Sequence, residues 1–194
     1  MLGETQPWGG SGRRGGLMAS RFCTRCAAPL PGPPPVRCTA CGYALYLNAK
    51  PSAGVVIVDT GGRFLAGRRA HHPQYGDWGL PAGFCDGWEH PADAAVREVA
   101  EELGVAIELG PLVGLYLGAY HFQDEVLPFL VAYYLARLAD PDAVPAPDPA
   151  EVSETAWFRL DDPPPLAFAA MADAVRDAAV LLDTGSWPGA VTSA

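Results

Sequence analysis

The chain has 194 residues and a formal net charge of −9, and 49% of its residues are hydrophobic. This length fits one catalytic domain of ordinary size with a small appendage and excludes two large independent domains. The acidic balance opposes a broad electrostatic surface for nucleic acid, and the apolar runs are too short to span a membrane. We therefore expect a cytoplasmic protein that acts on a small molecule, with neither nucleic acid nor a membrane as its partner.

The two ends of the chain have the composition of unstructured segments. Residues 1–20 are Gly-rich and polar without periodicity, which predicts a disordered tail, and residues 186–194 predict a flexible C-terminus. An export signal could begin at Arg13-Arg14, but Arg21 and Arg25 interrupt the segment before an adequate apolar region forms. Export is therefore not expected.

Four cysteines in residues 21–47 form two pairs of equal spacing. The pairs are Cys23-x2-Cys26 and Cys38-x2-Cys41, separated by eleven residues. Two such pairs are typical of one tetrahedral Zn²⁺ site, whereas disulfides are the alternative in an oxidising compartment. The sequence therefore predicts a small structural zinc ribbon, which would stabilise the N-terminal segment or assist a homodimer.

The next part of the chain predicts strands in two hairpins. The apolar segments 54–58 and 63–66 flank the turn Asp59-Thr60-Gly61-Gly62, which favours a first hairpin. The segments 112–122 and 127–138 are rich in Val, Leu, Tyr and Phe, and they flank a polar turn. We expect both hairpins to contribute to a mixed sheet.

Three further elements are expected towards the C-terminus. Residues 139–150 contain acidic and proline steps that interrupt any regular pattern, which predicts a surface loop beside a substrate cleft. Residues 155–158 would add a strand. Apolar residues recur at helical spacing over residues 166–182, which predicts a helix packed on the sheet.

A further helix is predicted after residue 90. Pro91 suits the first helical turn, and Gly104 is a natural C-terminal cap. Val96, Val99 and Leu103 recur at spacings of three and four, so we expect them to form the packed face of this helix.

Another face of the same helix would present Glu98, Glu101 and Glu102 together. Like charges at this spacing destabilise a helix by roughly 0.2–0.5 kcal/mol per pair, so three of them favour a bound cation. Oxygen ligands of this kind suit Mg²⁺ or Mn²⁺. Taken alone, an acidic pair such as Glu101-Glu102 is more often simply a solvated helical face.

A longer pattern surrounds these carboxylates. It reads G-x5-E-x7-R-E-U-x-E-E-x-G-U, where U is a bulky aliphatic residue. The positions that match it are Gly83, Glu89, Arg97, Glu98, Val99, Glu101, Glu102, Gly104 and Val105. This segment resembles the Nudix box at every specified position. The resemblance implies a Nudix hydrolase domain over residues 50–185, with an α/β/α sandwich and a mixed sheet, preceded by the small four-cysteine zinc ribbon.

The resemblance also implies roles for the box residues. Glu98, Glu101 and Glu102 would hold the catalytic metal together with the carbonyl of Gly83. Arg97 would orient a carboxylate, and Glu89 would pair with Arg97 structurally.

The general base would be a box glutamate or a carboxylate from a later loop. Glu125, Glu151 and Glu154 are the candidates outside the box, and we favour the box. Cys85, inside the box loop, is interpreted as a packing residue and not as a nucleophile.

The order of ribbon and box is similar to that of zinc-ribbon Nudix proteins, including NADH pyrophosphatases and ADP-ribose or FAD pyrophosphatase-like relatives. The S-Q-P-W-P-F-P stretch of NADH pyrophosphatases is replaced here by the sequence of residues 114–120. The implied activity is hydrolysis of a nucleoside diphosphate linked to another moiety, such as ADP-ribose, FAD or NAD(H). Arg68, Arg69 and Tyr120 are candidate substrate contacts, and His71 and His72 could help to clamp phosphate. The alternative is a nucleotide-sensing regulator that uses the ribbon to contact a partner.

Overall fold

The computed structural model describes residues 20–122 and 125–185. These residues divide into two compact units, one of residues 20–47 with 121–122 and 125–127, and a larger one of residues 48–120 with 128–185, which holds most of every strand in the two larger sheets. The tails predicted at residues 1–20 and 186–194 fall outside the described residues, apart from Ser20. The domain limits predicted from the sequence therefore stay predictions.

The cysteine-bearing unit contains a small antiparallel sheet. Its strands are β1 (Val36–Arg37) and β2 (Ala44–Leu45), with Val36 opposite Leu45. A second pair of backbone contacts joins Phe22 to Pro29 in an isolated bridge. The backbone of each cysteine pair is thereby held in a tight turn.

The larger unit contains two sheets. The first has the strand order β6-β3-β8-β7, with strands β6 (Ala82–Phe84), β3 (Lys50–Ile57), β8 (Glu125–Leu138) and β7 (Ile107–Phe122). The second has the order β5-β4-β9, with strands β5 (Trp78–Gly79), β4 (Arg63–Arg69) and β9 (Val152–Arg159). Strand β3 pairs antiparallel with β6 and parallel with β8, so the first sheet is mixed, as predicted.

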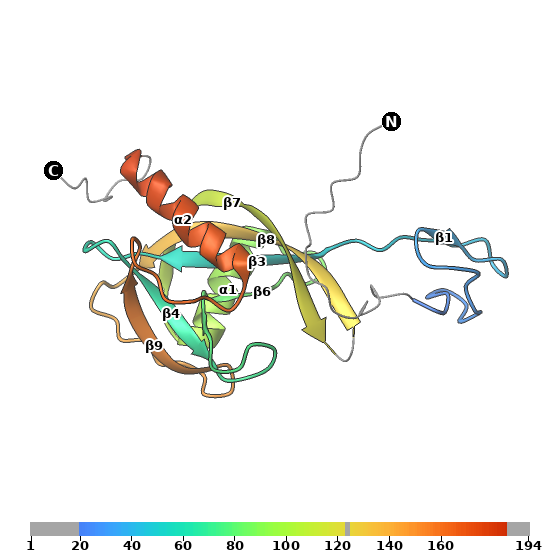
Figure 1. Cartoon of the computed structure of the whole chain (residues 1–194), viewed down its shortest axis with the longest axis horizontal. Coiled ribbons are helices and arrows are strands. Elements are labelled where there is room, and N and C mark those ends of the chain that lie inside the picture. The colour runs from blue at the N-terminus through green and yellow to red at the C-terminus, as the bar shows by residue number, and fades with distance from the viewer. Residues whose placement is uncertain (1–19, 123–124, 186–194) are drawn as a thin grey trace. The chain divides into compact units, whose positions relative to one another are not determined.

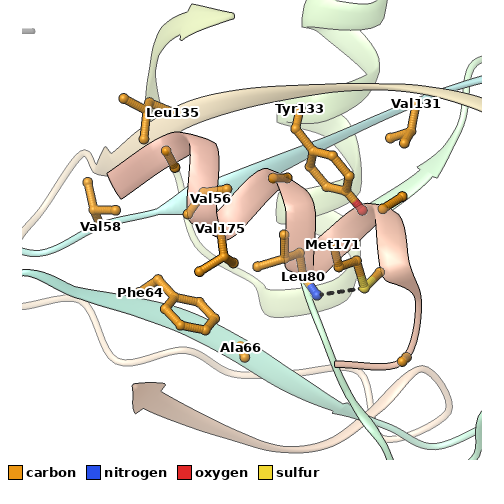
Figure 2. Close-up of a cluster of buried hydrophobic side chains, with 14 residues drawn as sticks. Val56, Val58, Phe64, Ala66, Leu80, Val131, Tyr133, Leu135, Met171 and Val175 are labelled. Carbon is orange, nitrogen blue, oxygen red and sulfur yellow. Dashed lines mark hydrogen bonds between the residues drawn. The ribbon is translucent and has the colours of Figure 1, made fainter. Parts of the chain in front are cut away.

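Two helices cover opposite faces of this arrangement, α1 (Pro91–Leu103) and α2 (Ala169–Asp183) (Figure 1). The side chains of β3 pack towards both helices, because successive side chains of a strand point to opposite faces of the sheet. Val56 lies in the cluster that contains Met171 and Val175 of α2 (Figure 2), and Val55 lies in the cluster that contains Val99 of α1. The predicted α/β/α sandwich is confirmed.

The first predicted hairpin is formed only at its turn, where the N–H of Asp59 donates to the carbonyl of Arg63 at 2.9 Å. Strands β3 and β4 follow one another in the chain, but they belong to different sheets and share only an isolated bridge between Val58 and Phe64. The reason lies in long-range pairing, since β4 matches β9 along its whole length from Arg63 opposite Arg159 to Arg69 opposite Val152. The turn was therefore predicted correctly, and long-range pairing decided only which strand lies beside β4.

The other predicted elements are present. Strands β7 and β8 are neighbours in the sheet, although β7 begins at Ile107, five residues earlier than predicted. The predicted strand at residues 155–158 lies within β9, and the predicted C-terminal helix corresponds to α2. Within the described residues, no helix is long and apolar enough to cross a membrane.

Candidate active site

Helix α1 is positioned by its two ends. The N-cap residue His90 accepts a hydrogen bond at Nδ1 from the N–H of Ala92 at 3.1 Å, and Pro91 occupies the first turn. At the other end Gly104 adopts a left-handed conformation with φ 65°, and its N–H donates to the carbonyl of Ala100 at 3.1 Å. A left-handed cap favours glycine, so the helix ends where the sequence predicted.

The packed face of α1 differs from the prediction at one residue. Val99 and Leu103 are fully buried, but Val96 is 40% exposed, and the remaining buried positions are Ala94 and Ala95. Ala95, Val99 and Leu103 recur every four residues and therefore define the buried face of the helix, so that Val96 lies at its edge.

Arg97 is the centre of an ion-pair network. Its Nε and Nη2 donate to the two carboxylate oxygens of Glu89, each at 2.8 Å, and Nη2 also donates to the carbonyl of Phe84 at 3.1 Å. Its Nη1 donates to Glu98 at 2.7 Å and to Glu101 at 2.9 Å. The bidentate bond from Arg97 holds the pKa of Glu89 at about 2. Glu89 is therefore an ionised anchor for the guanidinium, in the geometry that the Nudix resemblance implied.

Gly83 lies directly against the carboxylate of Glu98. A Cβ at this position would overlap the carboxyl group of Glu98, so a side chain cannot be accommodated without displacing it. Burial raises the pKa of Glu98, and Arg97 opposes this rise. The glycine therefore lets the strand backbone of β6 approach a partly buried carboxylate of α1.

Glu102 has a strongly perturbed carboxyl group. Burial, together with the charges of Glu98 and Glu151, raises the pKa of Glu102 to about 8, although a backbone hydrogen bond from Ala82 and the charge of Arg69 oppose the rise. A buried carboxylate beside other carboxylates is costly to ionise unless a cation is near. The donor set is made of hard oxygen atoms, which fits Mg²⁺ or Mn²⁺.

These carboxylates are not gathered around one point. Among the described residues, the only group of three or more His, Cys, Asp or Glu ligand atoms that all lie within 4.8 Å of one another is the set of four cysteines. Mg²⁺ usually keeps several waters and takes the rest of its ligands from one or two carboxylates and substrate phosphates. The spread of Glu98, Glu101 and Glu102 is compatible with such a shared coordination.

The three glutamates open into a cavity of about 610 Å³. The residues that line it are Ser52, Arg69, His71, Ala82, Gly83, Phe84, Asp86, Arg97, Glu98, Glu101, Glu102, Phe129, Val131, Tyr133, Asp148, Glu151, Phe168 and Met171. Carboxylates of α1 thus face cationic and aromatic side chains from β4, β8 and the segment before α2.

The candidate substrate contacts do not all lie at the cavity. Arg69 lines the cavity, whereas Arg68 does not: its Nη1 donates to Glu154 at 3.1 Å, and its guanidinium lies 5.6 Å from the ring centre of Trp78. The side chain of Tyr120 falls outside the described part of the chain. His71 lines the cavity, but His72 does not.

The candidate general bases outside the box also differ in whether they line the cavity. Glu151 lines the cavity, and its Oε2 lies 2.6 Å from Nε2 of His71. Glu154 pairs with Arg68 outside the cavity, and the side chain of Glu125 is not among those described. Glu151 is held from both sides, since its carbonyl accepts from Ala70 at 2.9 Å and its N–H donates to Asp148 at 3.0 Å.

Sequence reasoning missed several residues of the cavity wall. They are Ser52, Phe129, Tyr133, Asp148, Phe168 and Met171. One signal was available: Ser52 is a polar residue at the start of an apolar strand, and it is the only buried polar residue in the described chain. The other five come from elements whose packing only the tertiary structure defines.

Cys85 has the environment of a packing residue. Its side chain is packed against the α1 side of the core. Burial raises the pKa of its thiol, and the neighbouring carboxylate of Glu89 raises it further. A thiol with a raised pKa is a poor nucleophile at neutral pH, which agrees with the interpretation from sequence.

The four other cysteines form a compact cluster in the smaller unit. Sγ of Cys23 lies 3.7 Å from Sγ of Cys41, and Sγ of Cys26 lies 3.7 Å from Sγ of Cys38. Zn–S bonds of about 2.3 Å place the sulfurs of a tetrahedral site about 3.8 Å apart. The four cysteines are therefore positioned to bind zinc, and their thiols are free.

Comparison with known proteins places the larger unit in one family. A family model described as "NUDIX domain" matches residues 48–178. The chain is 33% identical over 134 residues to a protein of Novosphingobium aromaticivorans named RNA pyrophosphohydrolase, covering 62% of this chain and 83% of that protein.

Two further likenesses extend this match. The chain is 29% identical over 152 residues to a protein of Stutzerimonas stutzeri named NAD-capped RNA hydrolase NudC, covering 75% of this chain but only half of that protein. A crystal structure of a NUDIX hydrolase from Nitrosomonas europaea superimposes with a TM-score of 0.67 at 25% identity, covering 85% of this chain and 93% of that one.

Proposed function

The chain belongs to the NUDIX family, and from this premise we propose that it is a divalent-metal-dependent pyrophosphohydrolase. Its substrate would be a nucleoside diphosphate linked to another moiety, such as ADP-ribose, FAD or NAD(H). Water would attack one phosphorus atom, the bridging P–O bond would break, and two phosphorylated products would leave.

One observation carries this proposal. A single cavity of about 610 Å³ is lined both by Glu98, Glu101 and Glu102 of one helix and by Arg69 and His71. Cavities of roughly 300–1,000 Å³ hold ligands of the size of a nucleotide derivative. The carboxylates would hold the cation, and the cationic wall would receive the phosphates.

The metal site would use Glu98, Glu101 and Glu102 together with the carbonyl of Gly83. Bound Mg²⁺ or Mn²⁺ would neutralise phosphate oxygens and lower the pKa of an attacking water. Arg97 orients Glu98 and Glu101 through the hydrogen bonds of its Nη1. It is in turn anchored by Glu89. We favour a box glutamate as the general base, with Glu151 as the alternative because it lines the same cavity.

The ribbon would hold a structural Zn²⁺ through Cys23, Cys26, Cys38 and Cys41. Four thiolates close a tetrahedral site and leave no position open for chemistry. This part of the molecule would therefore add folding stability and not catalysis.

The names of the relatives widen the range of substrates to be tested. One relative is named for RNA pyrophosphohydrolysis and another for NAD-capped RNA. Both names describe chemistry at a diphosphate that is joined to a nucleoside. The net charge of −9 favours a small nucleotide over a long RNA strand for this chain.

The test is a substrate panel with the purified, zinc-loaded chain and either Mg²⁺ or Mn²⁺. ADP-ribose, FAD, NADH, a dinucleoside polyphosphate, NAD-capped RNA and 5′-triphosphorylated RNA would be compared by release of nucleoside monophosphate or pyrophosphate. We expect turnover of at least one small nucleotide. Inactivity on all six with both metals would contradict the proposal, and tight nucleotide binding without turnover would favour a regulator instead.

A further inference from the structure

Arg69 and Tyr133 are two of the polar side chains that line the cavity outside the box and outside its ion-pair network. We propose that Arg69 and Tyr133 together form a phosphate subsite that binds one phosphate group of the nucleotide by charge-assisted hydrogen bonds. This inference rests on the proposed function and deepens it, because it names the residues that would hold the phosphate on the wall facing the box glutamates.

Arg69 is fixed in place but keeps most of its donors available. Its Nε donates to the carbonyl of Pro73 at 2.9 Å, and its guanidinium carbon lies 5.3 Å from the ring centre of Phe168. In residues 20–122 and 125–185, no hydrogen bond or ion pair engages its two terminal nitrogens. A guanidinium oriented in this way presents a planar set of N–H donors that matches phosphate oxygens.

Tyr133 is a buried side chain with a polar end. Only 2% of the residue is exposed, and its ring lies in the core cluster beside Met171. Figure 2 shows the ring extending from β8 towards the end of α2 that carries Met171, with the hydroxyl at its far end. The ring lies against Gly54, where an added Cβ would come within 2.6 Å of it, so neighbouring backbone restricts its position.

The hydroxyl of Tyr133 has no hydrogen-bond partner among the side chains and backbone groups that the structure describes. Among the described residues, no fully buried side-chain N or O atom lacks a partner, so the unpaired hydroxyl must open into the cavity that Tyr133 lines. There it can donate to water or to a phosphate oxygen of a bound nucleotide.

The electrostatic surroundings favour an anion at this position. Burial raises the pKa of Tyr133, the charge of Glu102 raises it further, and Arg69 lowers it. The phenol therefore stays protonated as a neutral donor, close enough to both charged groups to feel their fields. A phosphate oxygen can accept from a phenol and a guanidinium at once, whereas an ionised carboxylate can only accept.

The chain offers matched controls for both residues. Tyr134 follows Tyr133 in β8 but packs against the opposite cluster, on the α1 side. Arg63 lies on the same strand as Arg69, pairs with Asp59 at 2.6 Å, and does not line the cavity. Tyr134→Phe and Arg63→Met therefore remove the same groups at positions that should not bind phosphate.

The experiment measures calorimetric binding of AMP and of adenosine to the zinc-loaded full chain in Mg²⁺. We expect Tyr133→Phe to weaken AMP binding about 10-fold, as for one hydrogen bond to a charged group, with a larger loss for Arg69→Met. Adenosine binding should change by less than about 2-fold, and the two control variants should match the unmodified chain. Without ligand, Tyr133→Phe should melt at the same temperature or higher, because its hydroxyl bonds no protein group in the part of the chain that the structure describes.

Three results would overturn the subsite. They are AMP binding no tighter than adenosine binding in the unmodified chain, unchanged AMP affinity in Tyr133→Phe, and a lower melting temperature of ligand-free Tyr133→Phe. The outcome is separable from that of the proposed function, since binding is measured without turnover. A chain that hydrolyses nothing but loses phosphate-dependent affinity in both variants would retain the subsite and lose the hydrolase assignment.

Discussion

The cysteine cluster and the glutamate cluster are both candidate metal sites, but they differ in how far the chain assembles them. All four cysteine Sγ atoms lie within 4.8 Å of one another, at separations that suit a single tetrahedral ion. The carboxylates of Glu98, Glu101 and Glu102 share no such common point, and Arg97 occupies one oxygen each of Glu98 and Glu101.

This difference indicates two kinds of metal chemistry. A fully assembled ligand set can hold an ion without outside help, which suits a structural role. A partly assembled set beside a cavity needs water or substrate oxygens to complete the coordination, which suits an ion that takes part in a reaction. The following predictions test this contrast, from the largest expected effect to the smallest.

Replacing Cys38 and Cys41 together by Ser should abolish zinc binding. Structural zinc contributes on the order of 10 kcal/mol to the folding of small zinc modules, so residues 21–47 should lose their ordered structure. Zinc content by mass spectrometry and amide dispersion in NMR spectra would measure both effects. Hydrolysis at the glutamate site should persist in the folded protein, and loss of recognition of one substrate alone would contradict a purely structural ribbon.

The pH dependence of stability should reveal the incomplete glutamate site. The pKa of Glu102 is raised from 4.5 to about 8 in the folded chain. Because the folded protein prefers the protonated form, its contribution to stability is complete below pH 4.5 and is lost as the pH rises towards 8. Each unit of pKa difference corresponds to about 1.4 kcal/mol.

Chemical denaturation from about pH 5 to about pH 8 would measure this slope. Without added Mg²⁺ the free energy of unfolding should fall as the pH rises, and Glu102→Gln should flatten the dependence. Added Mg²⁺ should restore stability at the upper end of this range by binding the ionised carboxylates. A slope that is the same in Glu102→Gln and the unmodified chain would show that Glu102 is not its source.

Glu151 and Glu154 form a matched pair close together in the chain. Glu151 lines the cavity beside His71, while Glu154 is paired with Arg68 outside it. We expect Glu151→Gln to lower kcat by about 10-fold or more with little change in KM, because a cavity carboxylate that helps to position or activate water acts mainly in the transition state. Glu154→Gln should be within about 2-fold of the unmodified chain, and equal effects of the two changes would exclude a special role for Glu151.

The smallest expected effect concerns the cysteine turns. Ala27 and Gly42 each follow the second cysteine of a pair, with φ of 58° and 74°, and each donates its N–H to the carbonyl of the first cysteine. A left-handed conformation costs alanine roughly 1 kcal/mol. Ala27→Gly should therefore slow zinc release and stabilise this unit by about 0.5–1 kcal/mol, and Gly42→Ala should do the reverse. Faster zinc release by Ala27→Gly and slower release by Gly42→Ala in a chelator competition assay would show that the turns are not strained.

The sequence predicted the parts of the molecule that depend on local spacing. The ends of α1 follow from Pro91 and Gly104, and the cysteine cluster follows from two repeated spacings. The features that were wrong or missed depend on long-range packing. Strand β4 pairs along its length with β9 and not with β3, and Val96 lies outside the buried helix face that Ala95, Val99 and Leu103 define.

The candidate site also combines residues that local spacing predicts with residues that only long-range packing brings together. The box glutamates could be read from one helix, whereas Tyr133 and Phe168 reach the cavity only because β8 and the N-terminal end of α2 lie beside it. Tyr133 is an ordinary strand aromatic in the sequence. Its hydroxyl becomes informative only when the structure places it at the cavity without a partner among the described residues.

The most direct test of the central claim is Mn²⁺ binding to the zinc-loaded chain, followed by electron paramagnetic resonance. The control variant is Glu108→Gln, because Glu108 is an exposed strand glutamate that pairs with Arg137 at 2.6 Å outside the cavity. We expect Glu102→Gln to weaken Mn²⁺ binding by at least about 10-fold and to lower hydrolysis by roughly 10³-fold, with Glu108→Gln unchanged in both. Unaltered Mn²⁺ affinity in Glu102→Gln would contradict the assignment of this helix face as the catalytic metal site.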